Sequence, residues 1–154
     1  MKSVEALTEQ FRARGLKVTP QRQSIFRALS TSTVHPTAES VYATVSAEMP
    51  TISLRTVYQT LNDLAAMGEL STLDVGSGPT RFDPNLEPHH HLVCDVCGRI
   101  DDLHASFPGV SVPADARASG FEVTATEIVF RGRCASCAAA ATRSHQPNTG
   151  DQHA

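Results

Sequence analysis

Tryptophan and long apolar runs are absent from this sequence of 154 residues. No apolar stretch approaches the roughly 20 residues that a membrane-spanning helix needs, which excludes such a helix. The opening residues, MKSVEALTEQFRARG, are amphipathic and lack the apolar core of a secretion signal. We therefore expect the protein to be cytoplasmic. The remaining composition, 40% hydrophobic and 19% charged, is ordinary for a folded chain that forms one domain or two small ones.

An excess of positive charge is also lacking. The net charge of −3 does not favour nucleic-acid binding when the chain is taken as a whole. Residues 1–73, however, contain seven Lys and Arg against six Asp and Glu, a net charge of +1. Residues 74–154 contain six against ten, a net charge of −4. This mild asymmetry is compatible with DNA binding by the N-terminal half.

Cysteine occurs only four times, in two Cys-x-x-Cys pairs formed by Cys94 with Cys97 and by Cys134 with Cys137. Four thiolates suit tetrahedral Zn²⁺ in both softness and geometry, so the sequence predicts a structural zinc site. Two disulfides are the alternative, which the expected reducing compartment disfavours.

Three consecutive histidines precede the first cysteine pair. In a β-strand, His89 and His91 would lie on one face and His90 on the other. Four sulfurs already complete a zinc site, so His89 and His91 indicate a second metal. The other ligands of that metal must come from elsewhere in the chain.

The first 83 residues have the pattern of a winged helix-turn-helix domain. Helical periodicity and capping residues predict four helices. They run over residues 3–14, from Pro20 onwards, from Pro36 to Pro50, and from Ser53 to about Met67. Strands over 69–75 and 80–83 flank a Gly-Ser-Gly-Pro turn and would form the wing.

The helix that begins at Ser53 is the candidate for reading DNA. Leu54, Val57 and Leu61 would face the core. The outer surface would carry a polar and aromatic set that suits a helix lying in the major groove. This set comprises Arg55, Thr56, Tyr58, Gln59 and Asn62. The alternative is an ordinary solvated helix face.

The C-terminal half is expected to form a small α/β domain over 89–141, after a hinge at 84–88. Beyond the histidines we expect a strand over 99–104, at most two helical turns around 112–119, and a long strand over 121–131. Residues 142–154 are polar and rich in small residues, which predicts a disordered tail. The fold class is thus α+β, with an N-terminal winged-helix domain over 1–83.

Five motifs occur in the order found in the ferric uptake regulator (Fur) family. They are TPQR at 19–22, HPTA at 35–38, TVY at 56–58, RFD at 81–83 and HHHLVCDVCG at 89–98. The sequence resembles this family over roughly residues 5–138. The resemblance implies a homodimeric, metal-activated transcriptional repressor that binds palindromic operator DNA. The zinc would staple the C-terminal domain, which would serve in dimerisation.

The same resemblance implies a regulatory Fe²⁺ or Mn²⁺ site. Its ligands fall on His35, Asp83, His89, His91 and Asp102, a set of imidazoles and carboxylates that suits either ion. Because these ligands come from both domains, the metal would fix the angle between them and hence the spacing of the recognition helices. The residues expected to contact DNA are Lys17, Arg22, Arg55, Thr56, Tyr58 and Gln59.

The aspartates at 83 and 102 resemble the peroxide-sensing PerR branch, since iron-sensing members usually carry glutamate there. We therefore expect a peroxide-responsive repressor that acts through iron-catalysed oxidation of a ligand histidine. The alternative is an iron- or manganese-responsive repressor of metal-uptake genes. The accessory metal site of iron sensors would need donors at Pro88, Gly109 and Thr126 besides His90, so we do not expect it.

Two further classes of protein fit less well. A metalloenzyme is disfavoured because no nucleophile–base pair accompanies the ligands, and we expect no enzymatic activity. A DNA-binding protein that is merely stapled by zinc would leave His89, His91 and Asp102 unexplained.

Overall fold

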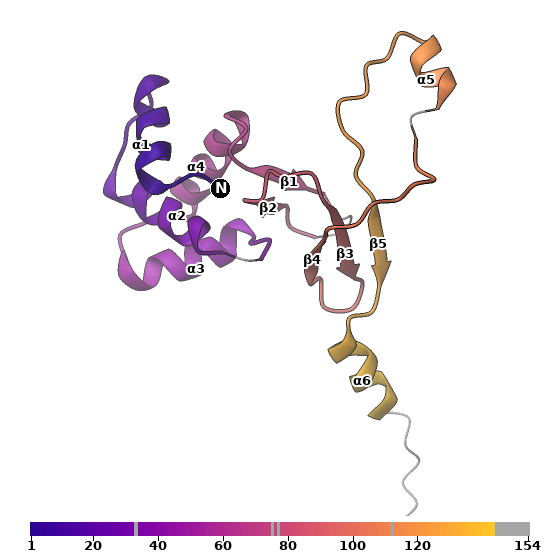
Figure 1. Ribbon diagram of the computed structural model, residues 1–154. Coiled ribbons are helices and arrows are strands. Elements are labelled where there is room, and N and C mark those ends of the chain that lie inside the picture. Colours follow the sequence, from indigo (N-terminus) through magenta and orange to yellow (C-terminus); the bar gives the residue numbers. More distant parts are fainter. Residues whose placement is uncertain (33, 75, 77, 112, 144–154) are drawn as a thin grey trace, which may run out of the picture. The chain divides into compact units, whose positions relative to one another are not determined.

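A computed structural model of the protein describes residues 1–143 except 33, 75, 77 and 112 (Figure 1). The chain divides into two compact units, Met1–Glu87 and Pro88–Ala154. The division falls inside the stretch 84–88, for which a hinge is predicted. Residues 144–154, which make up most of the predicted tail, lie outside the described residues. None of the helices that the structure describes is both long enough and apolar enough to cross a membrane.

Four helices build the first unit, and they confirm the four predicted from the sequence. They are α1 (Val4–Ala13), α2 (Pro20–Ser30), α3 (Ala38–Glu48) and α4 (Leu54–Ala66). Each begins at a hydroxyl residue whose side chain accepts a hydrogen bond from a backbone N–H three positions on. These N-caps are Ser3, Thr19, Thr37 and Ser53.

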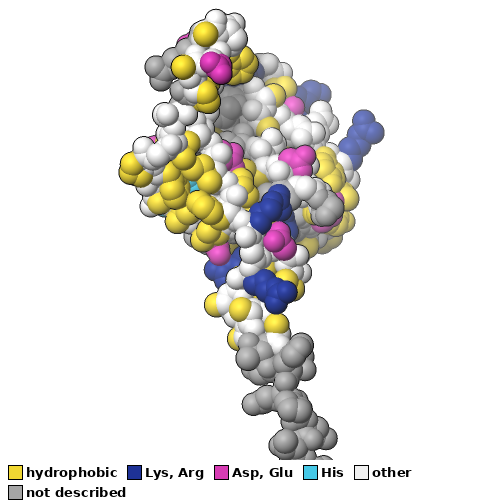
Figure 2. Space-filling model, turned by 90° about the vertical axis from the view of Figure 1, so that its right-hand side faces the viewer, with side chains coloured by type: hydrophobic (Ala, Val, Ile, Leu, Met, Phe, Trp, Pro, Cys, Tyr) yellow, Lys and Arg dark blue, Asp and Glu magenta, His cyan; other side chains and the backbone are white. Residues whose placement is uncertain are grey.

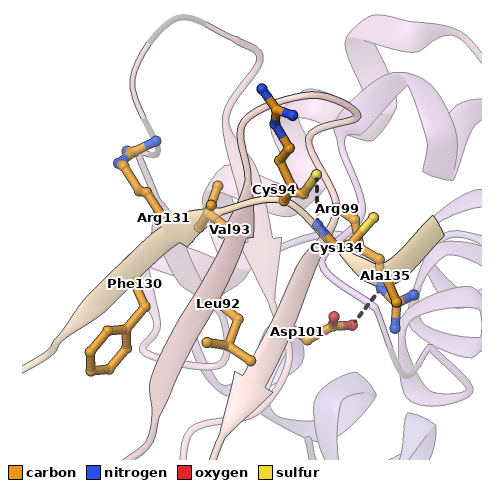
Figure 3. A pocket seen from close by; sticks show the side chains of 11 residues that line it. Leu92, Val93, Cys94, Arg99, Asp101, Phe130, Arg131, Cys134 and Ala135 are labelled. Atoms are coloured by element: carbon orange, nitrogen blue, oxygen red, sulfur yellow. Dashed lines mark hydrogen bonds and ion pairs between the residues drawn. The ribbon is translucent and has the colours of Figure 1, made fainter. Parts of the chain in front are cut away.

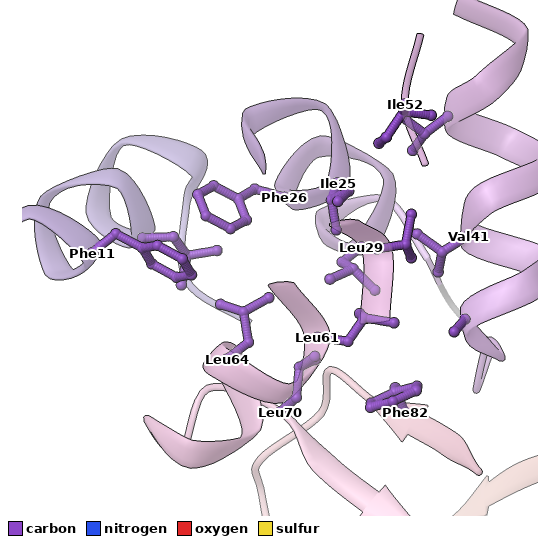
Figure 4. Close-up of a cluster of buried hydrophobic side chains, with 14 residues drawn as sticks. Phe11, Ile25, Phe26, Leu29, Val41, Ile52, Leu61, Leu64, Leu70 and Phe82 are labelled. Atoms are coloured by element: carbon purple, nitrogen blue, oxygen red, sulfur yellow. The ribbon is translucent and has the colours of Figure 1, made fainter. Parts of the chain in front are cut away.

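The core of the first unit lies where these helices converge (Figure 4). Phe11 and Phe26 pack edge to face, with their ring centroids 4.9 Å apart. Leu61 and Leu64 bury the apolar stripe of α4 against this cluster, which leaves the polar face of α4 outside. The sequence predicts Leu54 in the core, but the structure shows it exposed. The apolar face of α4 is buried only from Val57 onwards.

Two short strands, β1 (Ser71–Leu73) and β2 (Arg81–Asp83), pair antiparallel and form the wing. Phe82 is buried in the helical core, and its backbone N–H donates to the Pro36 carbonyl at 2.9 Å. The chain at residues 35–36 therefore lies beside β2. This pairing brings His35 next to Asp83.

The second unit is built on a three-stranded sheet in the order β4–β3–β5. The central strand, β3 (His90–Cys94), runs antiparallel to β4 (Ile100–Leu103) and parallel to β5 (Val129–Gly132). A short helix, α5 (Ala114–Ala118), precedes β5, and α6 (Ala135–Arg143) follows it. Helix α6 extends two residues past the point where the tail was predicted to begin.

The predicted long strand over 121–131 is wrong in its first part. Within this stretch the strand begins only at Val129 and forms β5 (Val129–Gly132). Val129 lies opposite His91, and β3 itself begins at His90, so residues before Val129 have almost no partner strand. Ile128 still bonds to β3, through the His91 N–H and His90 Nδ1. Residues 121–127 extend past the start of β3, and no described strand pairs with them there. Phe121 and Val123 in this segment are exposed.

Candidate metal centres and DNA-contact surface

The four cysteines meet at one end of the sheet of the second unit. Cys94 ends β3, Cys97 follows in a turn, Cys134 follows β5 and Cys137 lies in α6. Because β3 and β5 are parallel, with Cys94 opposite Gly132, both Cys-x-x-Cys pairs arrive at the same end. The four sulfur atoms all lie within 4.8 Å of one another. The structure thus brings together all four predicted zinc ligands.

The turn between the first two cysteines depends on Gly98. Its φ of 69° lies in the left-handed region that favours glycine. In this conformation the Gly98 N–H donates to the Cys94 carbonyl at 2.9 Å, which closes the turn and directs Cys97 back towards the group.

Hydrogen-bond donors favour the thiolate form of two of the four cysteines, Cys94 and Cys134. The Cys134 N–H donates to Cys94 Sγ at 3.3 Å (Figure 3), and this bond, with further backbone donors, lowers the pKa of Cys94 to about 6. The Ser136 hydroxyl lowers the pKa of Cys134. The Cys134 side chain in turn raises the pKa of Cys137 to about 12. A divalent cation would stabilise all four thiolates together, and an all-sulfur donor set fits zinc.

A second cluster lies at the face of the same sheet that carries His89 and His91. Their Nε2 atoms are 2.9 Å apart, which confirms the predicted alternation of the three histidines. Asp102 stands opposite His91 in the β3–β4 register, and its Oδ1 lies 3.6 Å from His89 Nε2. Two imidazoles and one carboxylate therefore converge within this unit.

His90 has a different environment. Its ring lies 5.0 Å from the ring of Phe107, and its Nδ1 accepts a hydrogen bond from the Ile128 N–H at 3.2 Å. His90 therefore helps to hold the segment before β5 against the sheet.

The first unit contributes a separate pair of donors. His35 Nε2 lies 3.7 Å from Asp83 Oδ2, and the two side chains are only 3% and 2% exposed. Asp83 Oδ1 accepts the Asn85 N–H at 2.7 Å. Burying a carboxylate costs free energy unless positive charge or hydrogen bonds compensate it. A divalent cation would supply further compensation, so this pair also fits a metal.

Most of the residues expected to contact DNA are accessible. Lys17, Arg55, Tyr58 and Gln59 are exposed, and Thr56 is half-buried at the start of α4. The buried stripe of α4 leaves this polar surface available for a nucleic-acid partner.

Arg22 is placed differently from the other five. Its Nη2 lies 2.7 Å from Asp63 Oδ2, and the side chains are only 12% and 23% exposed. Its Nη1 donates to the Lys17 carbonyl at 3.1 Å, and the guanidinium lies 5.1 Å from the centre of the Phe11 ring. Arg22 therefore fastens α4 to the start of α2.

Two further carboxylates, Glu39 and Glu127, have side-chain partners that were not predicted from the sequence. Glu39 bonds to Tyr58, and Glu127 bonds to His91. Each pair joins residues that are distant in sequence, and no local pattern signals either contact.

Hydrophobic side chains gather on the surface of the second unit (Figure 2). Leu92 and Phe130 lie side by side on β3 and β5 and point into the same hollow of about 370 Å³ (Figure 3). The other exposed residues of this kind are Val96, Val110, Phe121, Val123 and Val129.

The first unit is a winged helix with a histidine–aspartate pair, and the second is a small sheet with four grouped cysteines and further histidine and aspartate donors. These features define a metal-dependent DNA-binding regulator. The chain belongs to the Ferric uptake regulator family, whose model matches residues 13–131. This confirms the predicted family and fold class. Members of this family are transcription regulators rather than enzymes, and they bind DNA as dimers.

The chain is similar to individual regulators whose names refer to peroxide or to manganese. The chain is 35% identical over 126 residues to the peroxide-responsive repressor PerR of Staphylococcus epidermidis, covering 82% of this chain and 84% of that protein. It resembles the structure of PerR from Streptococcus pyogenes, with 28% identity, a TM-score of 0.51, and coverage of 89% and 94%. It also resembles a zinc-bound manganese uptake regulator, with 27% identity, a TM-score of 0.67, and coverage of 86% and 99%.

Proposed function

We propose that the protein is a cytoplasmic, peroxide-responsive repressor that binds palindromic operator DNA as a homodimer. Cys94, Cys97, Cys134 and Cys137 hold structural zinc. His35, Asp83, His89, His91 and Asp102 together hold regulatory Fe²⁺ or Mn²⁺. The donor set carries the proposal: three imidazoles and two carboxylates, without sulfur, suit these ions. Each unit supplies donors that already lie close together, as His35 does with Asp83 and His89 with His91.

The division of the ligands between the two units provides the switch. Binding one cation with donors from both units favours a single relation between the winged helix and the dimerisation domain. In a dimer this relation sets the spacing of the two α4 helices and hence the match to two operator half-sites. Loss of the cation releases that restraint and lowers operator affinity.

The surface of α4 supports the DNA-binding part of the proposal. Arg55, Thr56, Tyr58 and Gln59 read the operator from this helix, and Lys17 contributes charge near the phosphates. Arg22 supports the same surface by holding α4 in place through Asp63.

Peroxide acts through a ligand histidine. Bound ferrous iron supplies the electron-transfer chemistry that activates peroxide at this site. The role of the chain is to hold the imidazole of His35 or His89 beside it. One oxygen atom of the peroxide is added to the ring and the other leaves as water. The oxidised ring is a weaker donor, so the metal and then the operator are released.

The test is operator binding by the zinc-loaded protein with Fe²⁺ or Mn²⁺, before and after peroxide. We expect the iron form to lose the operator and to gain one oxygen atom on His35 or His89, as located by peptide mass spectrometry. The manganese form should stay bound. His90 is an internal control, because its ring faces Phe107 and should gain no oxygen. An iron form that keeps its operator, with unmodified His35 and His89, would sink the peroxide mechanism.

The second candidate is a repressor of metal uptake that responds to iron or manganese itself. The likeness to the manganese uptake regulator favours it. In that case the metal, and not peroxide, would control operator binding in the same experiment.

A further inference from the structure

Glu127 contacts one of the proposed metal ligands from outside the ligand set. Its Oε1 lies 2.8 Å from His91 Nδ1, and the His91 side chain is buried. Glu127 lies in the segment just before β5, one residue after Thr126, where iron-sensing members carry a donor of the accessory site. The resemblance to the family assigns no metal ligand to position 127 itself. Its own side chain is 46% exposed, so the contact is reached from the protein surface.

The two ring nitrogens of His91 have separate partners. Nε2 lies 2.9 Å from His89 Nε2, and Nδ1 meets the Glu127 carboxylate. A carboxylate accepts but does not donate, so the proton of a neutral His91 ring resides on Nδ1. This tautomer leaves the lone pair on Nε2, the nitrogen that shares a space with His89.

The backbone fixes Glu127 in this position. The His91 N–H donates to the Ile128 carbonyl at 3.0 Å, and the Ile128 N–H donates to His90 Nδ1 at 3.2 Å. The residue after Glu127 is therefore held by two neighbouring residues of β3. These two hydrogen bonds place the Glu127 carboxylate beside His91 although Glu127 itself lies outside any strand.

We propose that Glu127 is a positioning residue of the regulatory metal site, which holds the His91 ring and its tautomer ready for the cation. This inference rests on the proposed function, in which His91 is a ligand. Metal-bound histidines commonly donate their second N–H to a carboxylate, which orients the ring and makes the ligating nitrogen more basic. Glu127 supplies that carboxylate here.

Glu127 is not itself a ligand in this arrangement. Its carboxylate contacts Nδ1, which leaves Nε2, the nitrogen on the His89 side, as the one that would bind the cation. Asp102 lies near the Nε2 side, 3.6 Å from that of His89, and is the carboxylate placed to bind the cation from this unit. Asp102 and Glu127 thus have different roles, as a ligand of the cation and as the hydrogen-bond acceptor that orients His91.

The first test uses the zinc-loaded protein without regulatory metal. Long-range ¹H–¹⁵N NMR correlations report which nitrogen of His91 carries the proton. We expect Nδ1–H in the wild type and in Glu127→Gln, whose amide oxygen still accepts, and a mixture of tautomers in Glu127→Ala. Glu122→Ala is the matched control, since Glu122 is exposed on the same segment. A His91 tautomer unchanged in Glu127→Ala would overturn the proposal.

The second test is Mn²⁺ titration of the same variants, followed by electron paramagnetic resonance. Loss of an outer carboxylate weakens metal binding about 10-fold to 100-fold, and the exposure of Glu127 favours the lower figure. We expect Glu127→Ala to bind about 10-fold more weakly, Glu127→Gln to recover most of this loss, and Glu122→Ala to match the wild type.

The outcomes distinguish an absent regulatory site from an absent role of Glu127. A wild type that binds no Mn²⁺ contradicts the proposed regulatory site. A wild type and a Glu127→Ala variant that bind equally well contradict only the role of Glu127. A loss in Glu127→Ala as complete as in Asp102→Ala would make Glu127 a ligand and overturn the positioning role.

Discussion

The phenol of Tyr58 donates a 2.6 Å hydrogen bond to Glu39 Oε1 and so ties the exposed face of α4 to the first turn of α3. The bond to Tyr58 lowers the pKa of Glu39 from its ordinary 4.5, and the same bond raises the pKa of Tyr58 from 10.0. The carboxylate contribution to stability is present above pH 4.5 and is lost as the pH falls through the lowered value. The phenol contribution is lost as the pH rises above 10.0. Between these limits the pair stays intact.

Glu39→Ala should therefore reduce sequence discrimination, because the Tyr58 ring loses the contact that orients it. The bond is exposed to solvent and its loss is a modest change, so the ratio of operator to random-duplex affinity should fall by about two- to fivefold. Tyr58→Phe should give a similar loss, and the double variant should add little more. Fluorescence anisotropy on both duplexes measures the ratio. Glu48→Ala, on the same helix, should leave it unchanged.

Arg22→Ala should destabilise the first unit rather than remove a phosphate contact. Breaking its partly buried pair with Asp63 should cost about 2 kcal/mol, and a double-mutant cycle with Asp63→Ala should show strong coupling. The salt dependence of DNA binding should stay as in the wild type. Lys17→Ala should instead reduce the slope of log affinity against log salt by about 1. An equal fall in slope for Arg22→Ala would identify it as a phosphate contact.

Cys94→Ser should remove zinc and unfold the second unit. Zinc held by four sulfurs contributes on the order of 10 kcal/mol to the folding of small domains, far more than the sheet alone supplies. Zinc content and thermal melting measure the effect. Ser136→Ala is the control, because it removes only the hydroxyl near Cys134 and should retain zinc. Full zinc occupancy in Cys94→Ser would refute the assignment.

Phe130→Glu should separate the dimer, because Phe130 and Leu92 form an exposed apolar surface on the second unit. A buried glutamate at such a contact would lose its hydration without a partner. Sedimentation equilibrium of the zinc-loaded protein should show monomers. Leu86→Glu adds the same charge at an exposed leucine of the first unit and should leave the dimer intact. If the Phe130→Glu variant still sediments as a dimer, Phe130 does not lie in the dimer interface.

Local rules account for what the sequence predicted well. The helices begin where Thr19 and Ser53 provide caps, and the cysteine spacing alone indicated the group that the parallel β3–β5 pairing assembles. The alternation of His89, His90 and His91 also follows from the period of a strand.

Tertiary contacts account for what the sequence did not predict. The segment 121–128 alternates like a strand, but the start of β5 is set by the position at which its partner β3 begins. The partners of Arg22 and Glu127 are 41 and 36 positions away, so no local pattern reports them. Such pairings emerge only when helices and strands are placed side by side.

The parallel pairing of β3 with β5 joins two cysteine pairs that the ribosome makes at different times. Cys134 follows Cys94 by 40 positions, and the ribosome adds about 5–20 residues per second. The first unit, with its own core, is complete while the second cysteine pair has yet to be made. Each nascent chain therefore contains the complete sequence of the winged-helix unit before all four zinc ligands have been made. Under the proposed zinc assignment, zinc supply would therefore control only the second unit, after the whole first unit has been synthesised.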